Sequence, residues 1–185
     1  MARMPESILI AGAQRSGKTH FTDQLIQKSN RKTLIVDSDG YEKTWQKYKT
    51  ITADQLAKIK GKARILYDED DPMFFRRIRE QFLNGFLVFD DAMFFLADRR
   101  AEQFRKLFMK NRQMNNDIVF ICHGLSEVPP GLWPFFSVLI LFRTVDAFER
   151  SKSKIPNFEV MAERVIEVNN QAAKNPFHKT MYRLR

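Results

Sequence analysis

Residues 7–19, which read SILIAGAQRSGKT, decide the fold of this chain. Residues 12–19 match the pattern G-x-x-x-x-G-K-[S/T] in full. An apolar run at residues 7–13 predicts a short strand that enters a glycine-bearing turn, and residues 17–28 have helical spacing. In this order, backbone N–H groups and the positive end of a helix can surround phosphate groups. The sequence therefore predicts a phosphate-binding loop.

Two residues of this loop have specific expected roles. Lys18 should reach the β- and γ-phosphates of ATP, and the Thr19 hydroxyl should bind Mg²⁺. The backbone and side chains expected to contact the nucleotide are Gly12, Ala13, Gln14, Arg15, Ser16, Gly17, Lys18, Thr19 and His20. The alternative is a chance match at a glycine turn, which the flanking strand and helix disfavour.

A second pair of acidic residues follows an apolar run at residues 86–89. A central strand that ends here would place Asp90 beside the phosphate loop, in the Walker B position that holds the magnesium shell. Asp91 would then be the general base that orients water. Most enzymes of this type carry Glu at the second position, so Asp91 departs from the pattern. The alternative is a pair that caps the next helix.

Two further candidates lie between residues 99 and 123. The strand at residues 117–123 should end near the γ-phosphate, where His123 could donate to phosphate or position water; it could equally be a structural histidine. Residues 99–114 predict a basic helix, and Arg112, near its end, is the best candidate for an arginine finger. The same positive charge could instead contact nucleic-acid phosphates or simply face solvent.

Strands and helices alternate along the rest of the chain, which predicts an α/β fold with a mostly parallel central sheet in three layers. We expect residues 1–150 to form the core, and residues 151–185 to form a helix and a basic tail packed on it or extending from it. Further strands are predicted at 33–36, 63–67, 86–89, 118–122 and 138–142, and further helices at 41–48, 53–60, 72–83, 99–114 and 158–173.

Composition narrows the class of protein. The single Cys122 excludes a disulfide framework and a thiolate zinc cluster, and three scattered histidines disfavour a histidine metal site. No stretch is apolar enough to span a bilayer, and the N-terminus does not resemble a signal peptide, so we expect a cytoplasmic protein. The net charge of +9 favours an anionic partner, with nucleic acid ahead of a membrane surface.

With these motifs assembled, the chain resembles the FtsK–HerA superfamily of P-loop ATPases, and above all small viral genome-packaging ATPases; the zonula occludens toxin-like phage proteins are near relatives. The resemblance covers residues 7–144 and rests on residues 12–19, 89–91 and 111–123. It implies a RecA-like core, a homo-oligomeric ring, ATP-driven movement of DNA, a capsid or portal-type partner, and a location in host cytoplasm or virion. The superfamily usually has glutamine where this chain has His123.

Two other functions remain open on the residues alone. A small nucleotide or nucleoside kinase could use the arginine-rich region as a lid and Asp37 or Asp39 to hold an acceptor, but a kinase needs no water-orienting acid such as Asp91. A nucleotide-gated DNA-binding scaffold would bind ATP and turn it over slowly. A GTPase is disfavoured because the chain has no Asn-Lys-x-Asp motif.

Overall fold

The computed structural model describes residues 4–96, 101–145 and 148–184, which form one eight-stranded sheet with helices on both faces. Arg99 and Arg100 of the predicted basic helix lie outside the described residues. The elements in chain order are β1 (Ser7–Ala11), α1 (Lys18–Lys28), β2 (Thr33–Asp37), α2 (Lys43–Gln46), β3 (Lys49–Thr50), η1 (Ala53–Lys58), β4 (Lys62–Leu66), α3 (Phe74–Gln81), β5 (Phe86–Phe89), η2 (Ala92–Leu96), α4 (Ala101–Met109), α5 (Asn111–Met114), β6 (Asp117–Cys122), η4 (Leu125–Glu127), η5 (Pro130–Phe135), β7 (Val138–Phe142), η6 (Phe148–Lys154), α6 (Phe158–Ala172) and β8 (Lys179–Arg183).

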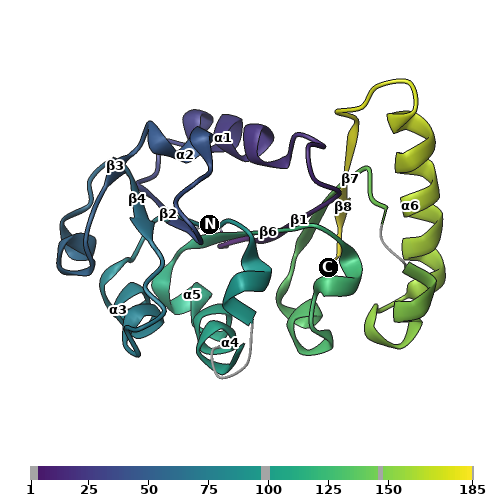
Figure 1. The fold of residues 1–185 in the computed structure, drawn as a ribbon. Coiled ribbons are helices and arrows are strands. Elements are labelled where there is room, and N and C mark those ends of the chain that lie inside the picture. Colours follow the sequence, from purple (N-terminus) through teal and green to yellow (C-terminus); the bar gives the residue numbers. More distant parts are fainter. Residues whose placement is uncertain (1–3, 97–100, 146–147, 185) are drawn as a thin grey trace.

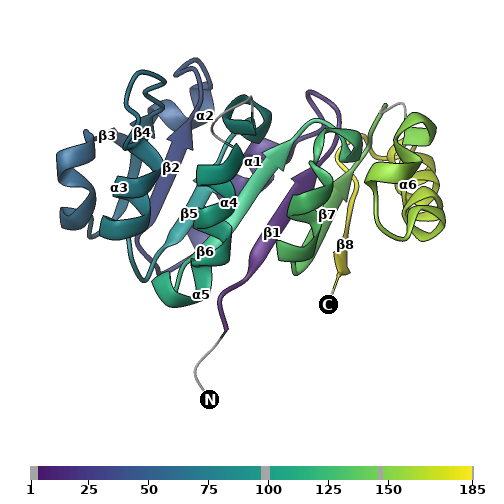
Figure 2. The ribbon, with the colours of Figure 1, turned by 90° about the horizontal axis from the view of Figure 1, so that it is seen from below.

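The strand order is β3-β4-β2-β5-β6-β1-β7-β8, and every pairing is parallel except that of β7 with β8. Figure 1 shows α1 and α2 above the sheet and α3, α4 and α5 below it. Figure 2 shows α6 standing beyond β8 at the edge. The predicted three-layer α/β fold with a mostly parallel sheet is confirmed.

The central strands are buried on both faces, which explains why they read as apolar runs rather than as alternating patterns. Successive side chains of a strand point to opposite faces. In β1, Leu9 enters the core on the side of α3 and α4, and Ile10 enters the core on the side of α1 and α2. On the first side Phe89 and Phe104 lie within an aromatic cluster, with their ring centroids 4.6 Å apart.

Several elements differ from the expectation. The helix expected to run to residue 83 ends at Gln81, because Phe82 turns into the core with no exposure. The segment after Thr52 is a 3₁₀ helix, with Thr52 and Gln55 forming the capping box. The basic helix breaks at Lys110 into α4 and α5. The two-residue strand β3 was not expected.

The largest difference from the expected fold lies in the basic tail, where residues 179–183 form β8, an antiparallel strand on β7. This pairing runs from Val138↔Arg183 to Phe142↔Lys179 and places the last part of the chain at the edge of the same sheet as the phosphate loop. Among the helices of the described ranges, none combines the length and apolar character needed to cross a membrane.

Candidate nucleotide site

A cavity of about 390 Å³ lies at the carboxyl ends of the parallel strands, beside the loop between β1 and α1. Open α/β sheets bind their ligands at the carboxyl ends of their strands. β6 stands between β1 and β5, so the ends of these three strands bring the phosphate loop, the acid pair and His123 to one pocket. The lining residues are Gln14, Arg15, Lys18, Thr19, Ser38, Asp39, Tyr41, Glu42, Asp90, Asp91, Ile121, Cys122 and His123.

Two glycines of the loop are required by its geometry. A Cβ built on Gly12 would lie 2.6 Å from the Cβ of Phe142, so only glycine lets β7 approach this closely. The contact is fixed by the Ala13 N–H, which donates to the carbonyl of Arg143 at 2.7 Å. Gly17 has φ +96°, a left-handed conformation that favours glycine, and it begins α1.

The start of α1 has properties suited to an anion. Gly17 provides no side-chain cap, so the first N–H groups of the helix keep their capacity to donate. The Ser16 hydroxyl oxygen is buried beside them and has no hydrogen-bond partner in the structure. A buried polar group without a partner is costly, and a phosphate oxygen would supply one.

Lys18 is folded back on the loop that it belongs to. Its Nζ donates to the carbonyls of Gly12 at 2.6 Å and Ala13 at 2.9 Å, and the residue is only 6 % exposed. Burial lowers the pKa of the Lys18 ammonium, although the nearby carboxylates of Asp90, Glu127 and Asp91 oppose that shift. The hydrogen bonds of the ammonium group go to two backbone carbonyls, and phosphate oxygens could replace these carbonyls as acceptors.

Asp90 is held by a residue that the sequence did not identify. The indole N–H of the fully buried Trp45 donates to Asp90 Oδ2, and the backbone N–H of Asp91 donates to Oδ1 at 3.2 Å. Burial raises the pKa of Asp90 to about 6, and the neighbouring carboxylates of Glu42 and Asp37 act in the same direction. Trp45 carries no sequence signal for this role because its position depends on how α2 packs across β2 and β5.

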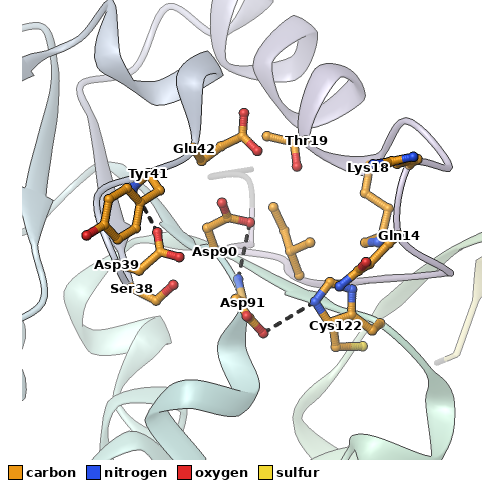
Figure 3. Close-up of a pocket in the computed structure, with 13 residues that line it drawn as sticks. Gln14, Lys18, Thr19, Ser38, Asp39, Tyr41, Glu42, Asp90, Asp91 and Cys122 are labelled. Carbon is orange, nitrogen blue, oxygen red and sulfur yellow. Dashed lines mark hydrogen bonds and ion pairs between the residues drawn. The ribbon is translucent and has the colours of Figure 1, made fainter.

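Asp91 and His123 both line the pocket and contact each other through their side chains. Figure 3 draws this contact as the dashed line that leaves the Asp91 carboxylate. His123 Nε2 lies 3.7 Å from Asp91 Oδ1, and the nearness of this carboxylate raises the pKa of His123 despite partial burial. The His123 backbone N–H donates to Glu127 Oε2 at 2.8 Å, while its Nδ1 is buried without a partner. Asp91 has φ +46°, so a strained turn presents this carboxylate to the cavity.

Glu42 lines the cavity and, like Trp45, has no sequence signal for its role. Figure 3 shows its carboxylate directed toward the Thr19 hydroxyl, with Asp90 on the other side of the same space. Glu42 also begins α2, since its Oε1 accepts from the Thr44 N–H at 2.9 Å. Its acid character complements a cation at Thr19 and Asp90 rather than a phosphate.

Two predicted site residues lie away from the cavity. His20 is exposed on the first turn of α1, where its ring contacts the Gln24 amide, so only its backbone could serve the nucleotide. Arg112 lies on α5, which precedes β6, and lines a different cavity of about 580 Å³ together with Arg183. The phosphate loop follows the carboxyl end of β1, whereas α5 precedes the amino end of β6. Because these two strands are parallel, Arg112 lies at the opposite end of the strands from the phosphate loop.

Comparison with known proteins places the fold. No protein-family model matches the chain, and no curated protein sequence matches it. Among solved structures, the genome-packaging NTPase B204 of Sulfolobus turreted icosahedral virus 2, in complex with AMP, is similar at TM-score 0.76 and 16% identity, over 99% of this chain and 94% of that one.

Two further structures share this arrangement. The DNA-packaging ATPase B204 of Sulfolobus turreted icosahedral virus is similar at TM-score 0.67 and 17% identity, over 98% of each chain. The cytoplasmic domain of the Thermomonospora curvata type VII secretion ATPase EccC is similar at TM-score 0.60 and 14% identity, over 96% of this chain and 24% of that one. The chain therefore has the fold of P-loop NTPases.

Proposed function

We propose that this chain is an ATP-hydrolysing motor that moves DNA, of the kind that packages a viral genome. The observation that carries the proposal is the meeting, in one cavity, of a complete phosphate loop, the Asp90 carboxylate and the Asp91–His123 pair. The likeness of the fold to two packaging NTPases supports the same function.

The loop residues would bind the triphosphate. On binding, Lys18 Nζ would exchange the carbonyls of Gly12 and Ala13 for oxygens of the β- and γ-phosphates, and Ser16 would gain a hydrogen-bond partner. The start of α1 adds N–H donors and the positive end of its dipole. These contacts are made mostly by backbone groups, so they select for phosphate and not for a particular base.

The residues around Thr19 fit a magnesium ion. Mg²⁺ takes oxygen ligands and commonly uses one or two carboxylates together with phosphate oxygens. Thr19 and Asp90 supply a hydroxyl and a carboxylate on facing sides of one space, with Glu42 beside them. Within the described ranges, no group of three or more His, Cys, Asp or Glu is arranged to hold a metal ion, so phosphate oxygens would have to complete its coordination. When bound, the ion would neutralise phosphate charge.

Asp91 would orient and deprotonate the attacking water, which is the step that distinguishes a hydrolase from a kinase. His123, with its Nε2 3.7 Å from Asp91 Oδ1, would lie beside the same water and could donate to the γ-phosphate. A kinase would exclude water at this position. The Asp91–His123 pair therefore favours hydrolysis over transfer to a small acceptor.

DNA contact and ring assembly are the finer parts of the proposal. The net charge of +9, with most of its excess after residue 92, suits a phosphate-binding surface without base readout. Arg112 lies near the amino ends of the strands, away from the phosphate loop of its own chain. It could therefore act as an arginine finger only on the nucleotide of a neighbouring copy. That geometry is what a homo-oligomeric ring provides.

The test measures phosphate release from ATP with and without duplex DNA of several unrelated sequences, and phosphate transfer to a panel of nucleosides. We expect DNA to stimulate hydrolysis regardless of its sequence, and stimulation to fall steeply as salt rises. Lys18→Ala is the control for turnover by contaminants. Transfer to a nucleoside would identify a kinase instead, and tight ATP binding with negligible turnover would identify a scaffold.

A further inference from the structure

The turn between α6 and β8 brings an exposed aromatic side chain to the phosphate loop. A Cβ built on Gly17 would lie 3.1 Å from Cδ1 of Phe177, so the ring edge of Phe177 contacts the loop directly. Phe177 is nevertheless 62 % exposed. Figure 1 shows this turn at the same end of the sheet as the start of α1, on the side of β7 and β8.

Hydrogen bonds within the turn and the start of β8 fix the backbone of this turn. The Phe177 N–H donates to Asn175 Oδ1 at 3.1 Å, and the His178 N–H donates to the Asn175 carbonyl at 2.8 Å. Directly after it, Lys179 pairs with Phe142 at the end of β7. An aromatic ring that is fixed in this way loses little conformational freedom when a ligand stacks on it.

The sheet order determines which end of a nucleotide would meet Phe177. β5 and β6, which carry the acid pair and His123, lie on one side of β1, whereas β7 and β8 lie on the other. If the γ-phosphate points to Asp91, as the proposed function requires, the nucleoside leaves the loop on the opposite flank. Phe177 stands on that flank, outside the cavity that the acid residues line.

A positive charge lies next to the same turn. Lys179 Nζ is 4.8 Å from the ring centroid of Phe21 on α1 and 5.8 Å from that of Phe142 on β7. The ammonium group thus lies above two rings that flank the loop. An aromatic face beside a cation is the combination that binds a nucleotide by stacking and charge together.

We propose that Phe177 is the base-binding platform of the nucleotide site, on which the purine of ATP stacks. This inference rests on the proposed function and deepens it, because it makes the C-terminal turn part of the nucleotide site. Stacking uses the π-face that every base has, so the platform binds purine nucleotides with little discrimination between them.

The experiment separates the base from the phosphates. Dissociation constants for ATP and for inorganic tripolyphosphate, each with Mg²⁺, are measured by calorimetry on the full chain and on Phe177→Ala. We expect Phe177→Ala to weaken ATP by about 5- to 150-fold, the scale of a lost base–aromatic stack, and to leave tripolyphosphate within about twofold. Phe177→Tyr, which keeps the ring, should bind ATP as the wild type does.

A matched control is available on β8, the strand that follows the turn. Met181 is 63 % exposed on β8, and Met181→Ala should leave both affinities unchanged. In a second measurement, the fluorescence of Phe177→Trp should be quenched by ATP and not by tripolyphosphate. Equal weakening of both ligands by Phe177→Ala, or no weakening of ATP, would overturn the platform. A wild type that binds neither ligand would instead overturn the proposed function.

Discussion

Replacing Asp90 with asparagine should stabilise the nucleotide-free protein at neutral pH, although it should remove the carboxylate proposed for magnesium. Burial raises the pKa of Asp90 from 3.8 to about 6, so the folded chain holds a carboxylate in a place that disfavours its charge. Asparagine has the same shape without the charge. Its Oδ1 can accept the hydrogen bond from Trp45, and its Nδ2 then faces the Asp91 N–H, so the longer hydrogen bond from that group at 3.2 Å is lost.

The magnitude follows from the shift in pKa. A difference of about two units between the folded and unfolded states corresponds to about 3 kcal/mol of unfolding free energy. Relaxation and residual solvent around Asp90 reduce this to about 1–2 kcal/mol. For a chain of this size, about 2–4 °C in Tm accompanies each kcal/mol, so Asp90→Asn should unfold about 2–8 °C above the wild type.

The pH dependence gives the sign of the effect. Between the unfolded pKa of 3.8 and the folded pKa of about 6, the folded carboxyl keeps a proton that the unfolded chain releases. The wild type therefore loses stability as pH rises through that window, and the full cost is present above it. The advantage of Asp90→Asn should be complete at about pH 8 and nearly absent at about pH 4.

Thermal unfolding followed by circular dichroism, without nucleotide or Mg²⁺, measures this difference at both pH values. Asp23→Asn is the control of opposite sign: burial alone would raise the pKa of Asp23, but hydrogen bonds from Lys47 and Tyr48 outweigh it and lower that pKa. Asp23→Asn should therefore lower Tm. Equal Tm values for Asp90→Asn and wild type at pH 8, or an advantage of the same size at both pH values, would refute the reasoning.

The remaining predictions concern the proposed hydrolysis. Lys18→Ala should abolish ATP turnover and most ATP binding, as calorimetry would show, because it deletes the charge on the phosphates; wild-type affinity would contradict the loop assignment. Asp91→Asn should keep ATP affinity and lose about 10²-fold or more in kcat, whereas normal turnover would place the base elsewhere. Since the Asp91 carboxylate raises the pKa of His123, the pH–rate profile should show a step above 6.5 that moves to lower pH in Asp91→Asn; an unmoved step would exclude the pair as its origin. Arg112→Ala should keep nucleotide affinity and lose turnover, and mixing it with Lys18→Ala should restore some activity; no recovery on mixing would count against a shared site.

The phosphate loop and the acid pair could be predicted because their positions follow from neighbouring residues. Residues 7–11 form a strand by composition, Gly12 and Gly17 permit the turn, and Lys18 starts the helix within the same segment. Asp90 and Asp91 follow their strand directly. Parallel strands then bring these ends together without further information.

Other features depend on contacts between distant segments. Trp45 meets Asp90 only because α2 packs against the sheet, and nothing near residue 45 indicates this. The segment KTMYR of β8 has no apolar run, and its residues alternate between exposed and half-buried, so it becomes a strand only through the free edge of β7. The position of Phe177 follows from β8 and was equally hidden from the sequence.

Several features of the candidate nucleotide site favour the binding of an anion and its cation. Lys18 donates to its own loop, Ser16 and His123 Nδ1 are buried without partners, and the pKa of Asp90 is raised by burial. The burial of the Lys18 and Asp90 charges and the unpartnered Ser16 and His123 atoms each cost stability in the free protein. Each would be improved by the triphosphate or its cation. Because a ligand that binds only the folded state stabilises it by mass action, the site links nucleotide binding to the stability of the whole sheet. If packing alone had shaped this cavity, we would not expect several buried polar atoms without hydrogen-bond partners to gather at the carboxyl ends of the strands.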